Sequence, residues 1–205
     1  MYALPTQTME RWKKDIETAI SLGVQHISSY GLIYEEGTAL TQAVEKRKLE
    51  AIDEDTENAM YDALCERLKQ AGFVHYEVSN FALPGYEAKH NSRYWDHTPY
   101  IGVGAGAHTY IPPVRCWNKD DLEGYIKGEE VRESETLTEK DLYNEGIMLG
   151  LRTNRGIADP LSVHSRKQIE EYIRKGLLRK TDDGRIVATQ EGIHILNRII
   201  EDLMI

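Results

Sequence analysis

The sequence predicts an α/β protein in two parts: a piece of parallel sheet with covering helices over residues 1–115, then a mostly helical, winged-helix-like domain over residues 116–205. Three observations support this. Helical and strand patterns alternate in the first part, and after Pro112-Pro113 the pattern changes to short helical segments with charged faces. The end of the chain has the pattern of a helix, a hairpin and a helix.

The first part opens on residues 2–8, which are typical of a strand tail and a turn, so we expect further chain upstream. Apolar residues at helical spacing then predict a helix that Gly23 ends, and residues 26–34 alternate as a strand does. The apolar residues of this helix are Met9, Trp12, Ile16 and Ile20. Glu35-Glu36-Gly37 is typical of a turn, and the charged residues 45–57 are typical of a solvated connection.

A second helix and a second strand complete this sheet region. The helix ends at Gly72, and its buried stripe consists of Met60, Leu64, Leu68 and Ala71. Apolar and polar residues alternate over 73–82, which predicts a strand whose end delivers Asn80 and Phe81 into a loop. The two predicted strands are joined by a connection long enough to contain a helix, which predicts parallel pairing. Ligands bind at the carboxyl ends of parallel strands.

The second part is predicted to consist of short helices and one hairpin. Thr138 and Asp141 have the spacing of a capping box that opens a helix. Asp182-Asp183-Gly184 is a hairpin turn signal between two further helical patterns. The apolar positions of the four expected helices are, in order, Leu122, Tyr125 and Ile126; Leu142, Ile147, Leu149 and Leu151; Ile169, Tyr172, Ile173 and Leu177; and Ile193, Leu196, Ile200 and Leu203.

Composition excludes several classes of protein. A formal charge of −9 disfavours nucleic acid as a partner, and the Lys and Arg residues of the last third are interleaved with acidic ones. No run approaches the ~20 apolar residues of a membrane span, and the first residues do not resemble a signal or transit peptide, so we expect a cytoplasmic protein. Cys65 and Cys116 form neither a disulfide framework nor a C-x-x-C motif.

The stretch from His90 to Tyr110 has the strongest functional signal. Gly102, Gly104 and Gly106 alternate with other residues between aromatic anchors, a pattern that lets a backbone or a ligand come close. Two interpretations stay open: a loop shaped for a ligand, and a glycine-rich turn packed by its own aromatic side chains. The spacing does not match the G-x-G-x-x-G of a dinucleotide site.

Three motifs carry a family resemblance: HNxxYW at His90–Trp95, GVGAGAH at Gly102–His108, and the upstream YEVSNFALPGYE. Together they resemble the HemW branch of the radical S-adenosylmethionine (SAM) proteins, which are relatives of the oxygen-independent coproporphyrinogen III oxidases. The resemblance covers nearly the whole chain. It implies the C-terminal part of an incomplete (βα) radical-SAM barrel, followed by a HemN-type C-terminal domain.

The HNxxYW motif has the chemical types that a haem site needs. A neutral imidazole ligates haem iron, and Tyr94 and Trp95 offer flat apolar surface to a porphyrin. On chemistry alone, His90 and Asn91 are as well explained by hydrogen bonds that hold the loop in place. The family resemblance implies that His90 is the haem-iron ligand and that Asn91, Tyr94 and Trp95 lie beside the haem.

The resemblance also implies S-adenosylmethionine and a 4Fe-4S cluster in full-length relatives. The backbone near Ile33 and the Ala107-His108 segment would lie beside the nucleoside, although core packing also explains the side chain of Ile33. The family's CxxxCxxC motif is absent, so the three thiolates that hold the cluster are missing from this chain. The sequence indicates no catalytic residue: Glu35, Glu36 and Glu77 lack a visible partner, and such carboxylates are usually solvated or ion-paired.

The resemblance favours haem binding and delivery, with haem or porphyrin and haem-accepting proteins as partners. The first alternative is an oxygen-independent coproporphyrinogen III oxidase, an oxidoreductase that decarboxylates coproporphyrinogen III, and the second is a non-enzymatic winged-helix adaptor. We also expect self-association, since an open partial barrel would expose a strand edge and apolar surface at Met1 and Tyr2.

Overall fold

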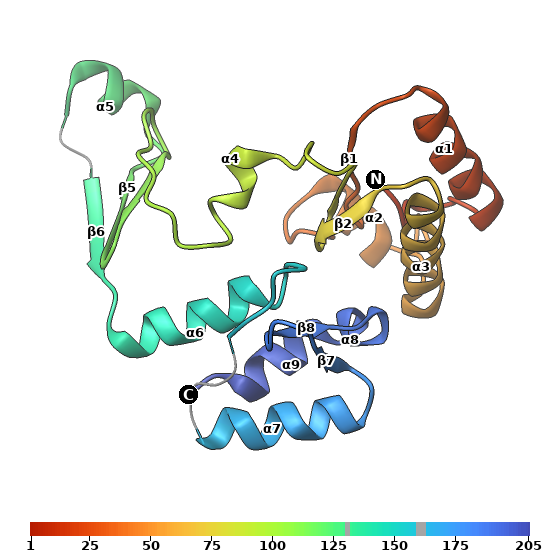
Figure 1. Cartoon of the computed structure of the whole chain (residues 1–205). Helices are drawn as coiled ribbons and strands as arrows, with labels where there is room; N and C mark the ends of the chain where they lie inside the picture. Colours follow the sequence, from red (N-terminus) through yellow and green to blue (C-terminus); the bar gives the residue numbers. More distant parts are fainter. Residues whose placement is uncertain (130–131, 159–162) are drawn as a thin grey trace. The chain divides into compact units, whose positions relative to one another are not determined.

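The computed structural model describes residues 1–129, 132–158 and 163–205 (Figure 1). It divides into two compact units, Met1–Glu87 and Ala88–Ile205. Each unit has its own buried residues, for example Phe81 in the first and Ile199 in the second.

The first unit combines three helices with a three-stranded sheet. Its elements are α1 (Met9–Ser21), β1 (His26–Ser28), α2 (Ala39–Glu45), α3 (Glu54–Gln70), β2 (Val74–Glu77) and β3 (Asn80–Ala82). Side-chain oxygens of Thr8, Thr38 and Asp53 accept a backbone N–H at the start of α1, α2 and α3, respectively. Gly23 and Gly72 follow α1 and α3 with positive φ, as predicted for residues that end helices. Helix α2 was not predicted.

The predicted parallel pairing is wrong for this sheet. The strand order is β1-β3-β2, and β3 runs antiparallel to both of its neighbours. The single strand predicted over residues 73–82 is a hairpin, because the chain turns at Val78 and Ser79. One local and one long-range bond hold this turn: the Ser79 N–H donates to the Glu77 carboxylate at 3.3 Å, and the hydroxyl of Tyr61 in α3 donates to the Val78 carbonyl at 3.0 Å.

The hairpin also changes the place of two residues that were expected in a loop. Asn80 and Phe81 belong to β3 and are buried in the middle of the sheet. Alternation of apolar and polar residues continues through a tight hairpin turn, so the pattern alone does not reveal it. The end of this strand therefore does not lead directly into the glycine-rich loop.

The packing of α1 against α3 forms the core of the first unit. The indole Nε1 of Trp12 donates to the Met60 carbonyl at 2.8 Å. The ring of Tyr2 lies 5.6 Å from that of Trp12 and 6.1 Å from that of Tyr61, and Tyr2 forms a parallel bridge with Gly31. The expectation that Tyr2 exposes apolar surface is therefore wrong, although Met1 is exposed.

The second unit begins with α4 and an antiparallel sheet. Its elements are α4 (Lys89–Ser92), β4 (His108–Ile111), β5 (Val114–Asn118), α5 (Leu122–Lys127), β6 (Arg132–Thr136), α6 (Glu139–Gly150), α7 (Val163–Arg174), β7 (Leu178–Lys180), β8 (Ile186–Ala188), α8 (Gln190–His194) and α9 (Leu196–Leu203). The sheet order is β4-β5-β6. Pro112-Pro113 forms the turn between β4 and β5, whereas the sequence suggested a change of domain there.

The boundary between the compact units therefore differs from the predicted one. The predicted division between residues 115 and 116 cuts through β5, whose residues pair with β4 on one side and β6 on the other. A division there would separate strands that share hydrogen bonds. The compact units divide between Glu87 and Ala88, before α4.

The C-terminal elements follow the predicted order of helix, hairpin and helix. The capping box of Thr138 and Asp141 is confirmed at the start of α6. Strands β7 and β8 are antiparallel around Gly184, which has a φ of 83°. The predicted last helix is interrupted at Ile195, which separates α8 from α9. The role of this C-terminal region as a winged-helix adaptor stays a prediction.

Within the described residues, no helix has both the length and the apolar character that crossing a membrane requires.

Candidate functional site

The HNxxYW motif forms α4 and the turn that follows it. His90 is exposed, and its Nε2 lies 3.0 Å from the hydroxyl oxygen of Tyr94, with the two rings edge to face. The carbonyls of His90 and Asn91 accept the N–H groups of Arg93 and Tyr94 at 3.2 and 3.0 Å. Main-chain bonds thus close the turn, and the imidazole of His90 stays at the surface.

A series of tyrosine rings connects this turn to the sheet of the second unit. The ring of Tyr94 lies 4.8 Å from that of Tyr100, and Tyr100 lies 6.1 Å from Tyr110. The main chains of Tyr100 and Tyr110 also exchange two hydrogen bonds of 2.9 Å. Burial raises the pKa of both hydroxyls, so both are protonated at neutral pH.

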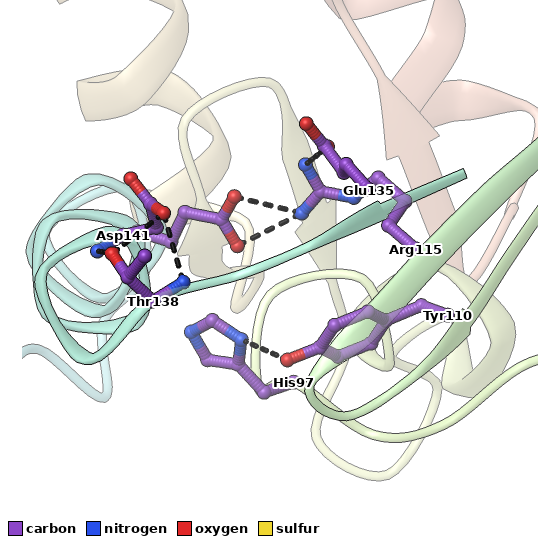
Figure 2. Close-up of polar contacts among 7 residues, drawn as sticks. His97, Tyr110, Arg115, Glu135, Thr138 and Asp141 are labelled. Carbon is purple, nitrogen blue, oxygen red and sulfur yellow. Dashed lines mark hydrogen bonds and ion pairs between the residues drawn. The ribbon is translucent and has the colours of Figure 1, made fainter. Parts of the chain in front are cut away.

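Arg115 anchors the end of this series (Figure 2). Its guanidinium carbon lies 5.7 Å from the centre of the Tyr110 ring. Its Nη2 donates to both carboxylate oxygens of Glu145 at 2.8 Å, and its Nη1 donates to Glu135 at 3.2 Å. Arg115 thus connects β5 to β6 and to α6.

The glycine-rich loop is held by groups of the chain itself. The N–H of Gly102 donates to the Thr109 hydroxyl at 3.0 Å, and a Cβ on Gly102 would lie 2.2 Å from the His108 carbonyl oxygen. Gly104, with a φ of 118°, donates to the Tyr125 hydroxyl at 3.1 Å and accepts from Asn118 at 2.7 Å. These contacts explain the glycines without a ligand. In contrast, the side chains of Ile101 and Val103 are exposed, Val103 at 84%.

The Ala107-His108 segment leads from this loop into β4. The N–H of Ala107 donates to the Gly104 carbonyl at 3.3 Å, and the Ala107 carbonyl accepts from Asn118 at 3.0 Å. The main-chain groups of Ala107 are thus already paired within the protein. His108 is exposed, and its ring lies 6.0 Å from that of its cross-strand partner Trp117.

Ile33 and Glu77 lie in the first unit, and the structure corrects the expectation for each. Ile33 is 78% exposed, so core packing does not explain its side chain. Glu77, expected to be solvated or ion-paired, is only 2% exposed. It accepts hydrogen bonds from the Asn80 side chain and the Ser79 N–H, and burial raises its pKa despite these bonds.

Comparison with known proteins gives consistent matches. The heme chaperone HemW of Lactococcus lactis is 36% identical over the whole chain, which covers 57% of that protein. HemW of Mycobacterium tuberculosis is 33% identical, again over the whole chain and 54% of that protein. The model of the HemN C-terminal domain family matches residues 137–195. The chain is a HemW-like sequence.

The expected resemblance to HemW is thus confirmed. The chain spans about half the length of the curated HemW relatives that it matches. A solved structure, the coproporphyrinogen III oxidase HemN from Escherichia coli, described as a radical SAM enzyme, has a TM-score of 0.73 at 19% identity. That likeness covers 99% of this chain and 53% of HemN, and it shows a shared mixed α/β fold.

The residues of this HemW-like chain do not fit an iron–sulfur cluster. Such clusters are held by several cysteine thiolates, and this chain has Cys65, buried in α3, and Cys116 in β5. Among the described residues, no group of three or more His, Cys, Asp or Glu side chains is placed to hold a metal ion. No chemical step is therefore assigned to a cluster here.

Within this HemW-like chain, the predicted haem-side residues His90, Asn91, Tyr94 and Trp95 share one turn of the second unit. Ala107 and His108 lie in the same unit, and Ile33 lies in the first. Sequence reasoning missed His97, which has a left-handed backbone and a hydrogen bond to Tyr110. Its position between HNxxYW and the glycines was the available signal. It also missed Arg115, whose partners are 20 and 30 residues away.

Proposed function

We propose that this chain carries the haem-binding part of a HemW-like protein and serves in haem delivery. The observation that carries the proposal is the exposed imidazole of His90 on α4, set edge to face against the partly exposed ring of Tyr94. Curated relatives that are 33% and 36% identical over the whole chain are named heme chaperones, which supports it. The cargo would be haem, and the partners would be haem-accepting proteins of the cytoplasm.

The chemistry of the surface around His90 supports haem as the ligand. A neutral imidazole is a common axial ligand of haem iron. The partly exposed ring of Tyr94 offers a flat face to a porphyrin, and Asn91 and Trp95 belong to the same turn. The exposed Ile101 and Val103 add apolar surface to the following loop of the same unit.

The role of S-adenosylmethionine remains part of the proposal. We assign Ile33, Ala107 and His108 to the nucleoside side of the site in full-length relatives. For Ile33 the support is its exposed position after the Tyr2–Gly31 bridge. For Ala107 the main-chain groups are already paired, so any contact would come from its methyl group or from the ring of His108. The longer proteins would supply the 4Fe-4S cluster from residues outside this chain.

The domain assignment is likewise proposed. Residues 1–115 would correspond to the C-terminal portion of the radical-SAM barrel and residues 116–205 to the HemN-type C-terminal domain. This is a division into family regions, and it does not coincide with the compact units, which divide before Ala88. The family match at residues 137–195 lies inside the second range and supports that half of the assignment.

A haem titration followed by optical absorption tests the main proposal. The wild-type chain is expected to give a saturable Soret shift at about one haem per chain. His90→Ala should weaken binding by at least about tenfold. His194→Ala, which changes a histidine of α8 in the same unit, is the matched control and should bind as wild type does. Equal binding by the wild type and His90→Ala would contradict the proposal.

The fold likeness to HemN favours one alternative, coproporphyrinogen oxidation. That reaction requires the radical chemistry of a reduced cluster, and this chain has only two cysteines. Anaerobic reconstitution with iron and sulfide, followed by metal analysis, separates the two functions. A stoichiometric four-iron cluster in this chain would favour the oxidase, whereas we expect no stoichiometric cluster.

A further inference from the structure

His97 lies in a turn that holds it in a backbone conformation that a histidine rarely adopts. Its φ is 57°, in the left-handed region that favours glycine and asparagine. The carboxylate of Asp96 accepts from the N–H and the hydroxyl of Thr98 at 3.1 and 2.5 Å and from Arg155 at 3.3 Å. This turn holds the half-buried ring of His97 beside the buried ring of Tyr110.

Figure 2 shows the hydrogen bond between His97 and Tyr110. The Nδ1 of His97 lies 3.1 Å from the hydroxyl oxygen of Tyr110, a residue that is 3% exposed. Burial raises the pKa of that hydroxyl, so it carries its proton at neutral pH. When the imidazole carries its own proton on Nε2, its Nδ1 is an acceptor and the tyrosine hydroxyl donates to it. The buried phenol thus has a base within hydrogen-bond distance.

The rings of three tyrosines lead from this pair to the surface of the second unit. Tyr110 lies 6.1 Å from Tyr100, and Tyr100 lies 4.8 Å from Tyr94, measured between ring centres. Tyr94 is 43% exposed, and its hydroxyl oxygen lies 3.0 Å from Nε2 of the exposed His90. The series therefore has a surface end at Tyr94 and an interior end at Tyr110, with an imidazole at the hydroxyl of each.

These contacts meet the chemical requirements of tyrosine oxidation. A tyrosine that loses an electron becomes a strong acid, so its oxidation at neutral pH needs a base that takes the phenol proton. Electrons pass readily between aromatic rings this close together. The guanidinium of Arg115 lies 5.7 Å from the Tyr110 ring centre and bonds to two carboxylates, those of Glu135 and Glu145. These carboxylates offset the positive charge that His97 gains with the proton.

We propose that Tyr94, Tyr100 and Tyr110 form a redox relay whose interior end is the hydrogen-bonded pair of Tyr110 and His97. The oxidant is a small one-electron oxidant that reaches Tyr94 from solution, such as an organic peroxyl radical. One electron moves from Tyr110 through Tyr100 and Tyr94 to the oxidant. The Tyr110 O–H bond breaks, its proton forms a bond to Nδ1 of His97, and Tyr110 remains as a neutral radical. The peroxyl radical gains the electron and a proton from water and becomes a hydroperoxide.

The test uses the whole chain without haem, because the relay goes beyond the proposed function and does not require haem. The oxidant is a photo-oxidised tris(bipyridine)ruthenium complex in solution, and frozen samples are measured by high-field electron paramagnetic resonance. The wild type should give a tyrosyl radical whose g-tensor shows a hydrogen bond to a protonated imidazole. Tyr110→Phe should abolish this signal. Tyr100→Phe, which keeps the ring and removes the oxidisable phenol, should abolish most of it.

Two further variants make the test specific. His97→Asn tolerates the left-handed backbone and lacks the base, so the imidazole-bonded signal should be lost. Tyr172→Phe is the matched control, because Tyr172 is another buried tyrosine of the same unit, and its hydroxyl donates to Asp202 at 2.6 Å. It should leave the signal unchanged. Thermal unfolding checks that each variant is folded.

The outcomes separate the relay from the proposed haem binding. A wild-type chain without an imidazole-bonded tyrosyl radical, or a radical that survives Tyr110→Phe or His97→Asn, would overturn the assignment of the interior end. A wild-type yield in Tyr100→Phe would overturn the relay. Since no haem is present, neither result bears on the role of His90, which the haem titration with His90→Ala tests.

Discussion

At the scale of single residues, the environment of Glu77 departs from what a carboxylate side chain suggests. It is almost fully buried in the turn of the β2–β3 hairpin, and its partners are the uncharged Asn80 and Ser79. A carboxylate is costly in such a place, and burial raises its pKa more than the bonds from Asn80 and Ser79 and the nearby His26 lower it. The protonated form is therefore favoured by folding.

The first prediction concerns the pH dependence that Glu77 causes. Because its pKa is higher in the folded than in the unfolded chain, its contribution to stability is present at low pH and is lost as the pH rises through the folded pKa. Glu77→Gln keeps an acceptor for Asn80 and removes the titration. We expect it to raise the free energy of unfolding at pH 7 by about 1 kcal/mol and to leave it unchanged or lower at pH 4.

Urea unfolding at a series of pH values between 4 and 8 measures this effect. Glu77→Ala is the control that removes the acceptor and leaves the Asn80 amide unpaired, and it should destabilise at every pH by about 1 to 3 kcal/mol. If Glu77→Gln is most harmful at pH 7, then the ionised carboxylate is needed and the stated pKa direction is wrong.

The second prediction compares two glycines. A Cβ on Gly102 would collide with backbone atoms of His108, whereas one on Gly146, inside α6, would meet no atom within 4 Å. Gly102→Ala should therefore cost about 2 kcal/mol or more. Gly146→Ala should stabilise by about 0.5 to 1 kcal/mol, because alanine is the better helix former. Thermal unfolding of both variants measures the two changes in stability. Equal changes would contradict the close approach of the His108 backbone to Gly102.

Residue-level prediction from sequence succeeded where the signal is local. The capping box of Thr138 and Asp141 is confirmed because both partners lie within one helical turn. The burial of Glu77 and the exposure of Ile33 depend on how the rest of the first unit packs around each residue. The left-handed backbone of His97 lies in a turn where Thr98 donates to the Asp96 carboxylate. Apolar spacing along the sequence indicates none of these three features.

At the scale of secondary-structure elements, one ion pair joins the β4-β5-β6 sheet to α6. Arg115 and Glu145 are 30 residues apart, their contact is bidentate, and both side chains are at least half-buried. Charge-assisted bidentate contacts of this kind are stronger than exposed ion pairs, which contribute about 0 to 1 kcal/mol.

The third prediction is a double-mutant cycle on this pair. Arg115→Met and Glu145→Gln should each destabilise, and together they should destabilise less than the sum, with a coupling energy of about 1 to 2 kcal/mol. The exposed pair Glu123 and Lys127 within α5 is the matched control, and its coupling should stay near 0.3 kcal/mol. Urea unfolding of the two cycles provides the measurement. Similar coupling in both would mean that Arg115 does not join the sheet to α6.

Most of the longer helices were predicted from the sequence, although α2 was missed and the last helix is interrupted at Ile195, whereas strand pairing was predicted poorly. Helices α1, α3, α5, α6 and α7 were expected from apolar spacing, because the helical repeat of apolar residues is visible within a short stretch of sequence. Strands β4 and β5 were missed, although aromatic and β-branched residues on both sides of Pro112-Pro113 are a hairpin signal. Antiparallel pairing in the first unit could not be distinguished from parallel pairing, because strand direction and register are determined by hydrogen bonds between residues distant in sequence.

At the scale of the whole molecule, the division into two compact units has a consequence for proteolysis. The chain between β3 and α4 consists of turns and bends, and within it Tyr86 is 58% exposed next to Gly85, whose φ is 87°. Exposed turns with few backbone hydrogen bonds are preferred sites of cleavage.

The fourth prediction is that chymotrypsin cleaves early after Tyr86 and releases two folded fragments, because each unit has its own core. Mass spectrometry identifies the cut, and circular dichroism of the separated fragments shows whether they are folded. Tyr86→Ala should slow this cleavage and leave the other cuts unchanged. Early fragments that do not end at Tyr86 would contradict the prediction.

The whole-molecule prediction from sequence was right about family and about a mixed α/β fold, and it differed on the boundary. Family resemblance depends on short motifs such as HNxxYW, each of which is contained in a few consecutive residues. A domain boundary depends on which segments contact each other. The residue pair Pro112-Pro113 gave a strong local signal at a hairpin turn, whereas the division between the compact units, after Glu87, has none of comparable strength.

The three tryptophans are distributed over both units, so their intrinsic fluorescence can report on each unit. Trp12 is buried against Met60 in the first unit, so it should emit at short wavelength until that unit melts. Trp95 and Trp117 are both half-buried in the second unit, on either side of the glycine-rich loop in sequence, and should emit further to the red. One emission spectrum can therefore follow both units at once. The long-wavelength part can show the second unit opening while the short-wavelength part still reports an intact first unit.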